Sequence, residues 1–270
     1  MSTSVSVSVI IPCFRCVKTL ERAMASVAAQ TVQPAEVILV DDASGDDTRT
    51  LMKNIRARFE SGWVKLVLLD KNVGAGSARN AGWAIASHPL IAFLDADDAW
   101  HSRKIEIQYS YMLANPDVVL SGHGFRVLKQ DALPCWNIVK STVMPVKKWR
   151  MILSNQFVTP SVMIRQDVAY RFIDHQRYME DHMLWLNVVC AGERVAKLPA
   201  DLTAIYKESF GVTGLSSMIW LMERGELNNY RRLYKKHYIN IFQFTGLVLY
   251  SLLKYLRRFL IYVIYLRWKK

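Results

Sequence analysis

The stretch Leu-Ile-Ala-Phe-Leu-Asp-Ala-Asp-Asp at residues 90–98 places an apolar run directly before three carboxylates. A short, continuous apolar run is typical of a strand buried on both faces, as in a parallel sheet covered by helices. The acids follow on the loop after that strand. In open α/β sheets, ligands bind beyond the carboxyl ends of the strands. The stretch therefore predicts both a fold class and the position of a site.

The residues before this stretch repeat the same plan, because apolar runs alternate with segments of helical spacing. We expect strands at residues 5–12, 36–41, 64–70 and 90–95, and helices at residues 20–29, 46–60 and 75–87. This order predicts an α/β fold with a mostly parallel, Rossmann-like central sheet and helices on both faces. The second strand also ends in acids, Asp41 and Asp42, which places more polar groups at the same edge of the sheet.

After this alternation the pattern is less regular, but no linker interrupts it. We expect helices at residues 103–115 and 181–191, and strands at residues 118–127 and 161–165. The sequence shows no internal repeat or second-domain boundary before about residue 230. We therefore predict one catalytic domain over residues 1–230 and a separate helical tail over residues 231–270.

The tail carries most of the net charge of +12, since it holds ten Lys and Arg residues and no Asp or Glu. Its apolar runs, 241–253 and 259–266, are separated by Lys254, Arg257 and Arg258. Those cations argue against one straight span of about twenty apolar residues. We expect amphipathic helices lying on an anionic membrane surface, with the cations toward the headgroups. A dimerising helix pair, and hence a homodimer, is an alternative; the long apolar runs argue against nucleic-acid binding.

The cysteines and the N-terminus suggest a reducing compartment. Cys13 and Cys16 form a lone C-x-x-C without further ligands at zinc spacing, so we interpret them as reduced, partly buried thiols, with a redox motif as the weaker alternative. Residues 5–11 are apolar but lack the charged start and cleavage site of a signal peptide. We expect a peripheral protein on the cytoplasmic face of the inner membrane.

The acids after residue 94 have the chemistry to hold a divalent cation. Alternate residues of an extended chain point to the same side, so Asp95 and Asp97 can converge. Carboxylates suit Mg²⁺ or Mn²⁺, which keep open positions for phosphate oxygens. Such a cation neutralises the charge that develops on a departing diphosphate. A solvated acidic turn is the alternative interpretation of this cluster.

Six segments, in order, resemble motifs of the family-2 glycosyltransferases with the GT-A fold, and the resemblance extends from residue 6 to about residue 217. They are SVIIPCF at 8–14, SVAAQT at 26–31, VDDAS at 40–44, NVGAGSARN at 72–80, LDADD at 94–98 and ED at 180–181. The resemblance implies an inverting, metal-dependent transfer of a sugar from a nucleotide diphosphate donor. It favours UDP, and the tail suggests a lipid-linked saccharide acceptor in cell-surface polysaccharide or lipopolysaccharide synthesis.

The resemblance also implies roles for individual residues in donor binding. Pro12 and Phe14 would lie against the base, Asp42 would accept from uracil N3–H, and Arg79 would contact the base or the phosphates. Asp95 would meet the ribose, Asp97 the metal, and Lys207 the diphosphate. Many relatives have Tyr-Asn where this chain has Phe14-Arg15.

Asp181 is the catalytic base that the resemblance implies. It would remove the proton of the acceptor hydroxyl as that oxygen attacks C1 from the face opposite the diphosphate. The local pattern, an acid ahead of His182-Met183-Leu184-Trp185, equally predicts a helix N-cap. Considered without its motif, Asp181 is better explained as a cap.

Three other function classes share parts of this pattern. A dinucleotide-binding oxidoreductase would use a G-x-G turn like residues 74–79, although Arg79 stands where close packing requires a small residue. A sugar nucleotidyltransferase would show a glycine-rich loop after the first strand, where this chain has residues 12–15 without glycine. A non-catalytic nucleotide-sugar binding module would not need Asp181.

Overall fold

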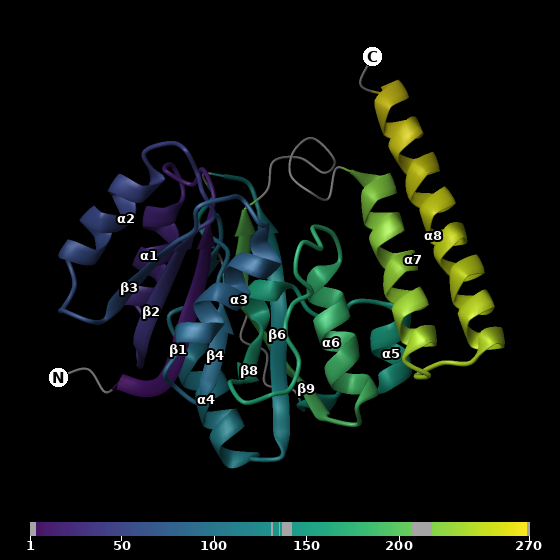
Figure 1. Ribbon diagram of the computed structural model, residues 1–270, viewed down its shortest axis with the longest axis horizontal. Helices are drawn as coiled ribbons and strands as arrows, with labels where there is room; N and C mark the ends of the chain where they lie inside the picture. Colours follow the sequence, from purple (N-terminus) through teal and green to yellow (C-terminus); the bar gives the residue numbers. More distant parts are fainter. Residues whose placement is uncertain (1–3, 131, 135, 137–141, 207–217, 269–270) are drawn as a thin grey trace.

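The computed structural model describes residues 4–130, 132–134, 136, 142–206 and 218–268, with side chains as far as residue 261. One sheet runs through the molecule, and the helices lie on its two faces (Figure 1). The strands are β1 Ser4–Cys13, β2 Gln33–Asp41, β3 Val64–Leu68, β4 Leu90–Phe93, β5 Ala99–Trp100, β6 Val118–Leu128, β7 Met144–Pro145, β8 Met163–Arg165 and β9 Arg194–Tyr206.

The strand order is β3-β2-β1-β4-β8-β6-β9-β5, and β7 pairs with β9. Strands β3, β2, β1 and β4 are parallel to one another, whereas β8 runs antiparallel to both β4 and β6. The predicted alternation of strand and helix over the first hundred residues is confirmed. Because these four strands are parallel, their carboxyl ends meet at one edge of the sheet.

The helices cover both faces, as the alternation predicted. They are α1 Leu20–Ala28, α2 Thr48–Ala57, α3 Ala75–Ile85, α4 Lys104–Ala114, α5 Lys148–Leu153, α6 Glu180–Cys190, α7 Ile219–Lys235 and α8 Ile241–Trp268. One apolar core packs α1, α2 and α4 on one face, and another packs α3, α6 and α7 on the other. Along β1 the faces alternate: Val9 and Ile11 enter the first core and Ile10 the second.

The elements that the sequence did not reveal lie after residue 98. The longest is β9, whose interior contains Pro199 and Asp201 and therefore lacks the apolar run of a buried strand. Its pairing with β6 shifts register near these residues, between Gly122 and Phe125 of β6. The six-residue helix α5 and the two-residue strands β5 and β7 are too short to show a hydrophobic period in the sequence.

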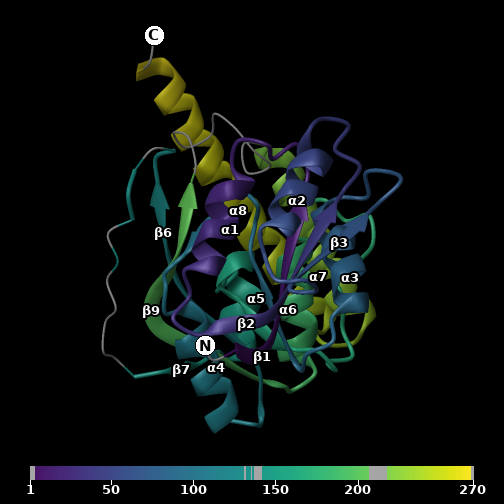
Figure 2. The ribbon, with the colours of Figure 1, turned by 90° about the vertical axis from the view of Figure 1, so that its left-hand side faces the viewer.

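The expected boundary at residue 230 falls inside α7. Tyr230 and Leu233 of α7 and Leu247 of α8 are buried in the same core as α6. The helix pair is thus packed onto the body rather than hanging from it, although α8 extends past the rest of the molecule (Figure 2). Among the described residues, no helix is both long enough and apolar enough to cross a membrane.

Candidate active site

The edge where β1, β2 and β4 end brings the predicted donor residues together. The backbone amide of Asp42 donates to the carbonyl of Cys13 at 2.8 Å, and that of Leu94 donates to Ile10 at 3.1 Å. Asp42 follows β2 and Asp95 follows β4, and these two strands lie on either side of β1. Pro12 is half-buried at the end of β1, and the Phe14 ring that follows is 46% exposed.

Asp42 holds the loop that leads into α3. Its Oδ1 accepts from the amide of Val73 at 2.7 Å, and its Oδ2 accepts from the amide of Gly74 and the side-chain amide of Asn72, both at 2.9 Å. Gly74 has φ +89°, a conformation that favours glycine. The carboxylate of Asp42, which the sequence analysis assigned to the nucleotide base, thus holds the loop over residues 72–74 in this structure.

Arg79 of α3 joins the two acidic motifs. It is buried, and its Nη2 donates to Oδ1 of Asp95 at 2.6 Å, while Nη1 donates to Oε1 of Glu180 at 3.4 Å. Burial opposes its charge, but the carboxylates of Asp95, Glu180 and Asp181 outweigh that effect and raise the pKa of Arg79. The sequence placed Arg79 at the site but did not show this bridge, whose ends are 85 residues apart in the chain, at positions 95 and 180.

Gly76 allows α3 to approach α6 closely enough for that bridge. A Cβ at Gly76 would lie 3.0 Å from Cγ of Glu180 and 3.3 Å from Cβ of Phe172. The glycines of the 72–80 motif therefore serve the turn into α3 and its packing against Glu180. This local role accounts for the G-x-G pattern without a dinucleotide.

Asp181 lies in the first turn of α6, next to Glu180. The helix begins at Glu180, and its N-cap is Met179, which has φ +56° and makes no side-chain cap bond. The interpretation of Asp181 as an N-cap is therefore wrong. Instead, its Oδ2 accepts from Nδ2 of Asn155 at 3.2 Å and from Oγ1 of Thr159 at 3.4 Å. Neither of these orienting residues was identifiable from a motif.

The surroundings of Glu180 raise the pKa of its carboxyl group. Burial, and next the negative charge of Asp181, raise the pKa of Glu180 from 4.5 to about 7, although Arg79 opposes the shift. Three carboxyl groups, Asp95, Glu180 and Asp181, thus surround one buried guanidinium. A buried carboxyl with a raised pKa, beside two further carboxyl groups at a sheet edge, is typical of an active site.

The remaining acids lie on the loop after β4. The Asp97 side chain is exposed, and its backbone carbonyl accepts from Nη2 of Arg22 at 2.6 Å. Asp98 is buried, and its Oδ1 accepts from the amide of Tyr206 at 3.2 Å. Among the described residues, no group of three or more His, Cys, Asp or Glu side chains converges as a ready metal cage. Lys207, which follows Tyr206, lies outside the described residues.

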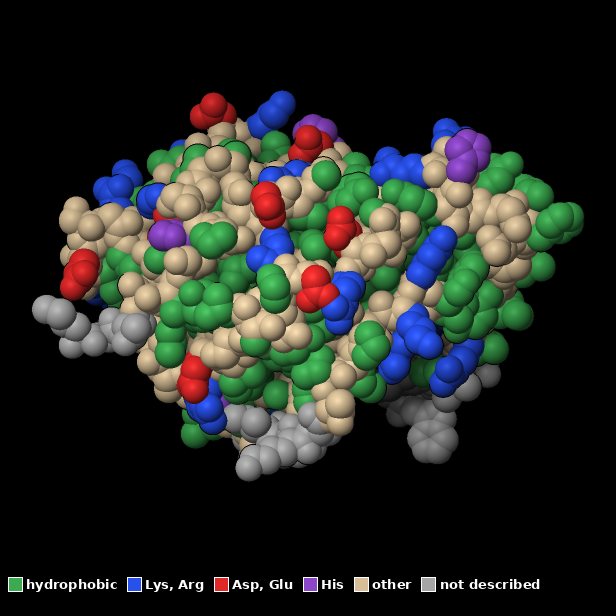
Figure 3. Space-filling model, turned by 90° about the horizontal axis from the view of Figure 1, so that it is seen from below, with side chains coloured by type: hydrophobic (Ala, Val, Ile, Leu, Met, Phe, Trp, Pro, Cys, Tyr) green, Lys and Arg blue, Asp and Glu red, His purple; other side chains and the backbone are tan. Residues whose placement is uncertain are grey.

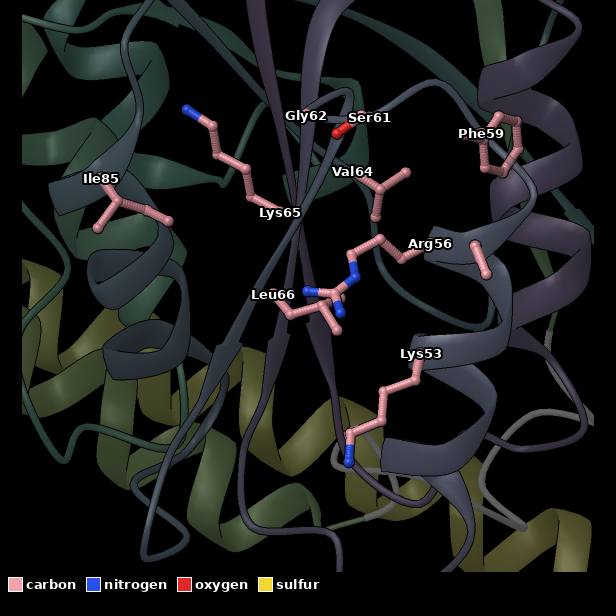
Figure 4. Close-up of a pocket in the computed structure, with 10 residues that line it drawn as sticks. Lys53, Arg56, Phe59, Ser61, Gly62, Val64, Lys65, Leu66 and Ile85 are labelled. Carbon is pink, nitrogen blue, oxygen red and sulfur yellow. The ribbon is translucent and has the colours of Figure 1, made fainter.

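An open hollow of about 750 Å³ lies elsewhere, between α2 and β3 (Figure 4). Its walls include the basic side chains of Lys53, Arg56 and Lys65 and the apolar side chain of Ile85. None of the predicted site residues lines it, and Lys65 is already paired with Glu36. We therefore place the site at the acidic strand ends and not in this hollow.

Comparisons with known proteins identify the family and the fold of the chain. The family model "Glycosyl transferase family 2" matches residues 8–164, more than half of the chain. The amylovoran biosynthesis glycosyltransferase AmsE of Erwinia amylovora is 32% identical over 200 residues, which cover 70% of each chain. The Escherichia coli protein WfgD, named as a UDP-Glc:α-D-GlcNAc-diphosphoundecaprenol β-1,3-glucosyltransferase, is 30% identical over 185 residues, 68% of this chain and 69% of that protein.

A solved structure shows the same fold. Residues 1–349 of S. aureus TarS, crystallised with UDP-GlcNAc, superpose with a TM-score of 0.68 at 19% identity, covering 85% of this chain and 67% of that TarS fragment. The similarity confirms the predicted GT-A architecture. With the strand-end acids, the Arg79 bridge and the family match taken together, the chain belongs to glycosyl transferase family 2 and is a glycosyltransferase with the GT-A fold.

Proposed function

We propose that this enzyme transfers a sugar, with inversion and with the help of a divalent cation, from a UDP-sugar to a hydroxyl of a diphospholipid-linked saccharide in polysaccharide synthesis. The observation that carries the proposal is the continuous set of contacts Asp95–Arg79–Glu180, which joins the motif suited to the donor with the motif suited to the acceptor. Relatives whose names specify polysaccharide synthesis and a diphosphoundecaprenol-linked acceptor support it.

For the donor, the chemistry of the strand-end acids suits Mg²⁺ or Mn²⁺. Mg²⁺ is commonly held by one or two carboxylates together with substrate phosphates, so a three-residue cage is not required. The exposed Asp97 is the proposed ligand. The carboxylate of Asp95, 30% accessible beside Arg79, would face the ribose. The bound cation would neutralise charge on the departing UDP.

Arg79 is proposed to link the catalytic base electrostatically to the residues that bind the donor. Arg79 fixes Asp95 through a short charged hydrogen bond and offsets the negative charge of Glu180 and Asp181. Phe14 and Pro12 would contact the base of the nucleotide. Asp42 acts first by holding the 72–74 loop, and a contact to uracil N3–H would use its remaining acceptor capacity.

In the transfer step, Asp181 takes the proton of the acceptor hydroxyl. The oxygen then forms a bond to C1 as the bond from C1 to the β-phosphate oxygen breaks, and UDP leaves with that electron pair. Asn155 and Thr159 donate to Oδ2 of Asp181, which keeps the carboxylate oriented. No covalent intermediate forms, so a single base suffices.

For the lipid-linked acceptor, the outer face of α8 is the proposed contact with an anionic membrane surface. Phe242, Leu249, Leu253, Leu256 and Leu260 are all exposed on this helix. Figure 3 shows hydrophobic side chains gathered over the α7–α8 end of the molecule, with Lys and Arg side chains beside them. Exposed apolar groups next to cations suit the headgroup region of an anionic bilayer.

The orientation of α8 differs from the one that the sequence led us to expect. Two of the three central cations turn inward: Lys254 donates to Glu226 of α7, and Arg258 donates to Glu223 at 3.2 Å. The buried side of α8 also includes Ser251, which donates to Glu223 at 2.6 Å. The apolar side is left outward, so apolar contact rather than these cations would give most of the membrane affinity.

The experiment that tests the proposal is a release assay across a panel of nucleotide sugars, with a synthetic α-GlcNAc-diphosphate lipid as acceptor, with and without Mn²⁺. We expect acceptor-dependent release of UDP that requires the metal. Calorimetry should show that Mn²⁺ tightens UDP binding to the wild type but not to Asp97→Asn. UDP release that is equal with and without chelator would contradict the metal-dependent mechanism.

A further inference from the structure

The C-terminus of α5 is capped by three helices that are distant in sequence. A helix leaves its last four carbonyls without partners of its own. In α5, the carbonyl of Met151 accepts from Nε2 of His182 at 2.8 Å. The carbonyl of Ile152 lies 3.2 Å from the hydroxyl of Tyr230, and that of Leu153 lies 3.4 Å from Nζ of Lys254.

We call these three carbonyls and their partners the carbonyl cap. Its donors come one each from α6, α7 and α8, so it joins these three helices to one short helix. Because a carbonyl only accepts, Nε2 of His182 must carry a proton. Burial lowers the pKa of His182 and so favours the neutral ring. A cation such as Lys254 is also favourable near the negative end of a helix.

Glu226 of α7 links two of the cap donors. Its Oε1 accepts from the Tyr230 hydroxyl at 2.7 Å and from Nζ of Lys254. Burial opposes ionisation of Glu226, but Lys254 and Tyr230 outweigh it and lower the pKa of this carboxyl. Tyr230 has a single hydroxyl proton and two acceptors, of which the Glu226 carboxylate at 2.7 Å is the stronger and the Ile152 carbonyl at 3.2 Å the weaker. Tyr230 therefore holds Glu226, and through it Lys254, beside the last carbonyls of α5.

The cap leads directly to the proposed base. Two residues after Leu153, Nδ2 of Asn155 donates to Oδ2 of Asp181 at 3.2 Å. Oδ1 of Asn155 accepts from the amide of Phe157, whose ring packs over Gly122 of β6. The segment that presents Asn155 is thus fixed at one end by the sheet and at the other by the carbonyl cap.

We propose that Tyr230 and Lys254 are positioning residues for the transfer reaction, which act by holding α5 so that Asn155 orients the Asp181 carboxylate. This inference rests on the proposed role of Asp181 as base. It gives the C-terminal helix pair a role in the chemistry that is separate from any contact with lipid. A misplaced base costs rate without costing donor affinity, because donor binding uses the other end of the site.

The test compares Lys254→Met and Tyr230→Phe with Asn155→Ala, using UDP-glucose and a soluble short-chain GlcNAc-diphosphate lipid, or the donor and acceptor that the panel identifies. We expect kcat to fall roughly tenfold in each variant while KM for the donor stays unchanged. Lys254→Arg should restore most of the rate. Arg224→Met, which removes an exposed cation of α7, should behave as the wild type.

Coupling through Asn155 is read from the double variant. If Lys254 acts through Asn155, then Lys254→Met adds little to the loss already caused by Asn155→Ala. Losses that multiply would overturn the proposal, as would a wild-type rate in both Lys254→Met and Tyr230→Phe. A rise in donor KM equal to the fall in kcat would also contradict a positioning role.

Hydrogen exchange provides a readout that does not depend on the substrates. We expect amides of residues 154–158 to exchange faster in Lys254→Met and Tyr230→Phe than in the wild type or Arg224→Met. Unchanged exchange there would overturn the inference even if Asp181 is the base. Full activity of Asp181→Asn would instead overturn the proposed function, so the two failures are distinguishable.

Discussion

Different interactions position the residues of two regions: the strand ends proposed to bind the nucleotide-sugar donor, which we call the donor side, and the C-terminal helix pair of α7 and α8. On the donor side, parallel strands bring Asp42 and Asp95 to one edge, and each acid lies within two residues of the end of its strand. In the helix pair, polar groups such as Glu223 and Ser251 are buried between α7 and α8, while leucines face outward. The comparison teaches that strand topology positions the residues of the donor side, whereas contacts between individual side chains position α8 against α7.

The largest effect is expected from replacing the proposed catalytic base, Asp181. Asp181→Asn should lower acceptor-dependent transfer by about 10²–10⁴-fold, since a general base contributes rate of that order. UDP affinity, measured by calorimetry, should stay near that of the wild type. Asp167→Asn, at an exposed acid before Val168, is the matched control. Wild-type transfer by Asp181→Asn would show that the base lies elsewhere.

The donor side should be the more sensitive region to loss of one charge. Arg79→Met leaves Asp95 and Glu180 facing each other without their buried counter-charge, and should lower the free energy of unfolding by about 3–5 kcal/mol. Arg58→Met breaks an exposed pair with Glu21 and should cost about 0–1 kcal/mol. Urea unfolding of both variants measures the difference, and equal losses would contradict the bridging role of Arg79.

The outer face of α8 should be the region that controls membrane binding. Leu253→Glu replaces a leucine that is 66% exposed on α8 and should weaken binding to phosphatidylglycerol-containing vesicles about tenfold or more. Leu113→Glu changes a leucine of α4 that is 67% exposed and should leave binding unchanged. Point substitutions suit this test because deleting residues 231–270 would also remove Leu233 and Leu247 from the core.

Sedimentation separates the two occupants that the sequence suggested for this face. A wild-type dimer that ignores vesicles and becomes a monomer on Leu253→Glu would identify the face as a homodimer interface. That result would contradict membrane docking.

A pH-dependent effect on stability concerns Glu180, at the boundary between the two regions. Its pKa in the folded protein is raised to about 7 from an ordinary 4.5. The folded state therefore binds the proton more tightly than the unfolded chain between these values, and stability falls as the pH rises through that window. Glu180→Gln should gain thermal stability relative to the wild type between about pH 5 and pH 8. A constant difference in melting temperature across that range would contradict the shift.

The sequence predicted the donor side well because its signals are local. An apolar run followed by acids identifies both a buried strand and the edge where it ends, so the position of Asp42, Asp95 and Asp97 after β2 and β4 could be predicted from residues 40–42 and 93–98, while their roles in binding stay predictions. The motif around Arg79 located that residue as well. Its bridge to Glu180 was not predictable, since a single sequence does not show which distant carboxylate a buried arginine meets.

The C-terminal half was harder to predict for a physical reason. In β9, Pro199 and Asp201 hide the strand, because its stability comes from pairing with β6 rather than from its own apolar pattern. In α8 the cations at positions 254 and 258 are indistinguishable by composition from membrane-facing ones. Only the position of Glu223 and Glu226 on the facing helix decides where those cations point.

The carbonyl cap on α5 has a practical consequence for protein engineering. Its third donor, Lys254, comes from the middle of the helix that an experimenter would trim first to improve solubility, because of its exposed leucines. Trimming before that lysine would leave Glu226 with a buried negative charge and no cation to match it. Replacing outward-facing leucines by polar residues is the safer route to a soluble enzyme that keeps its rate.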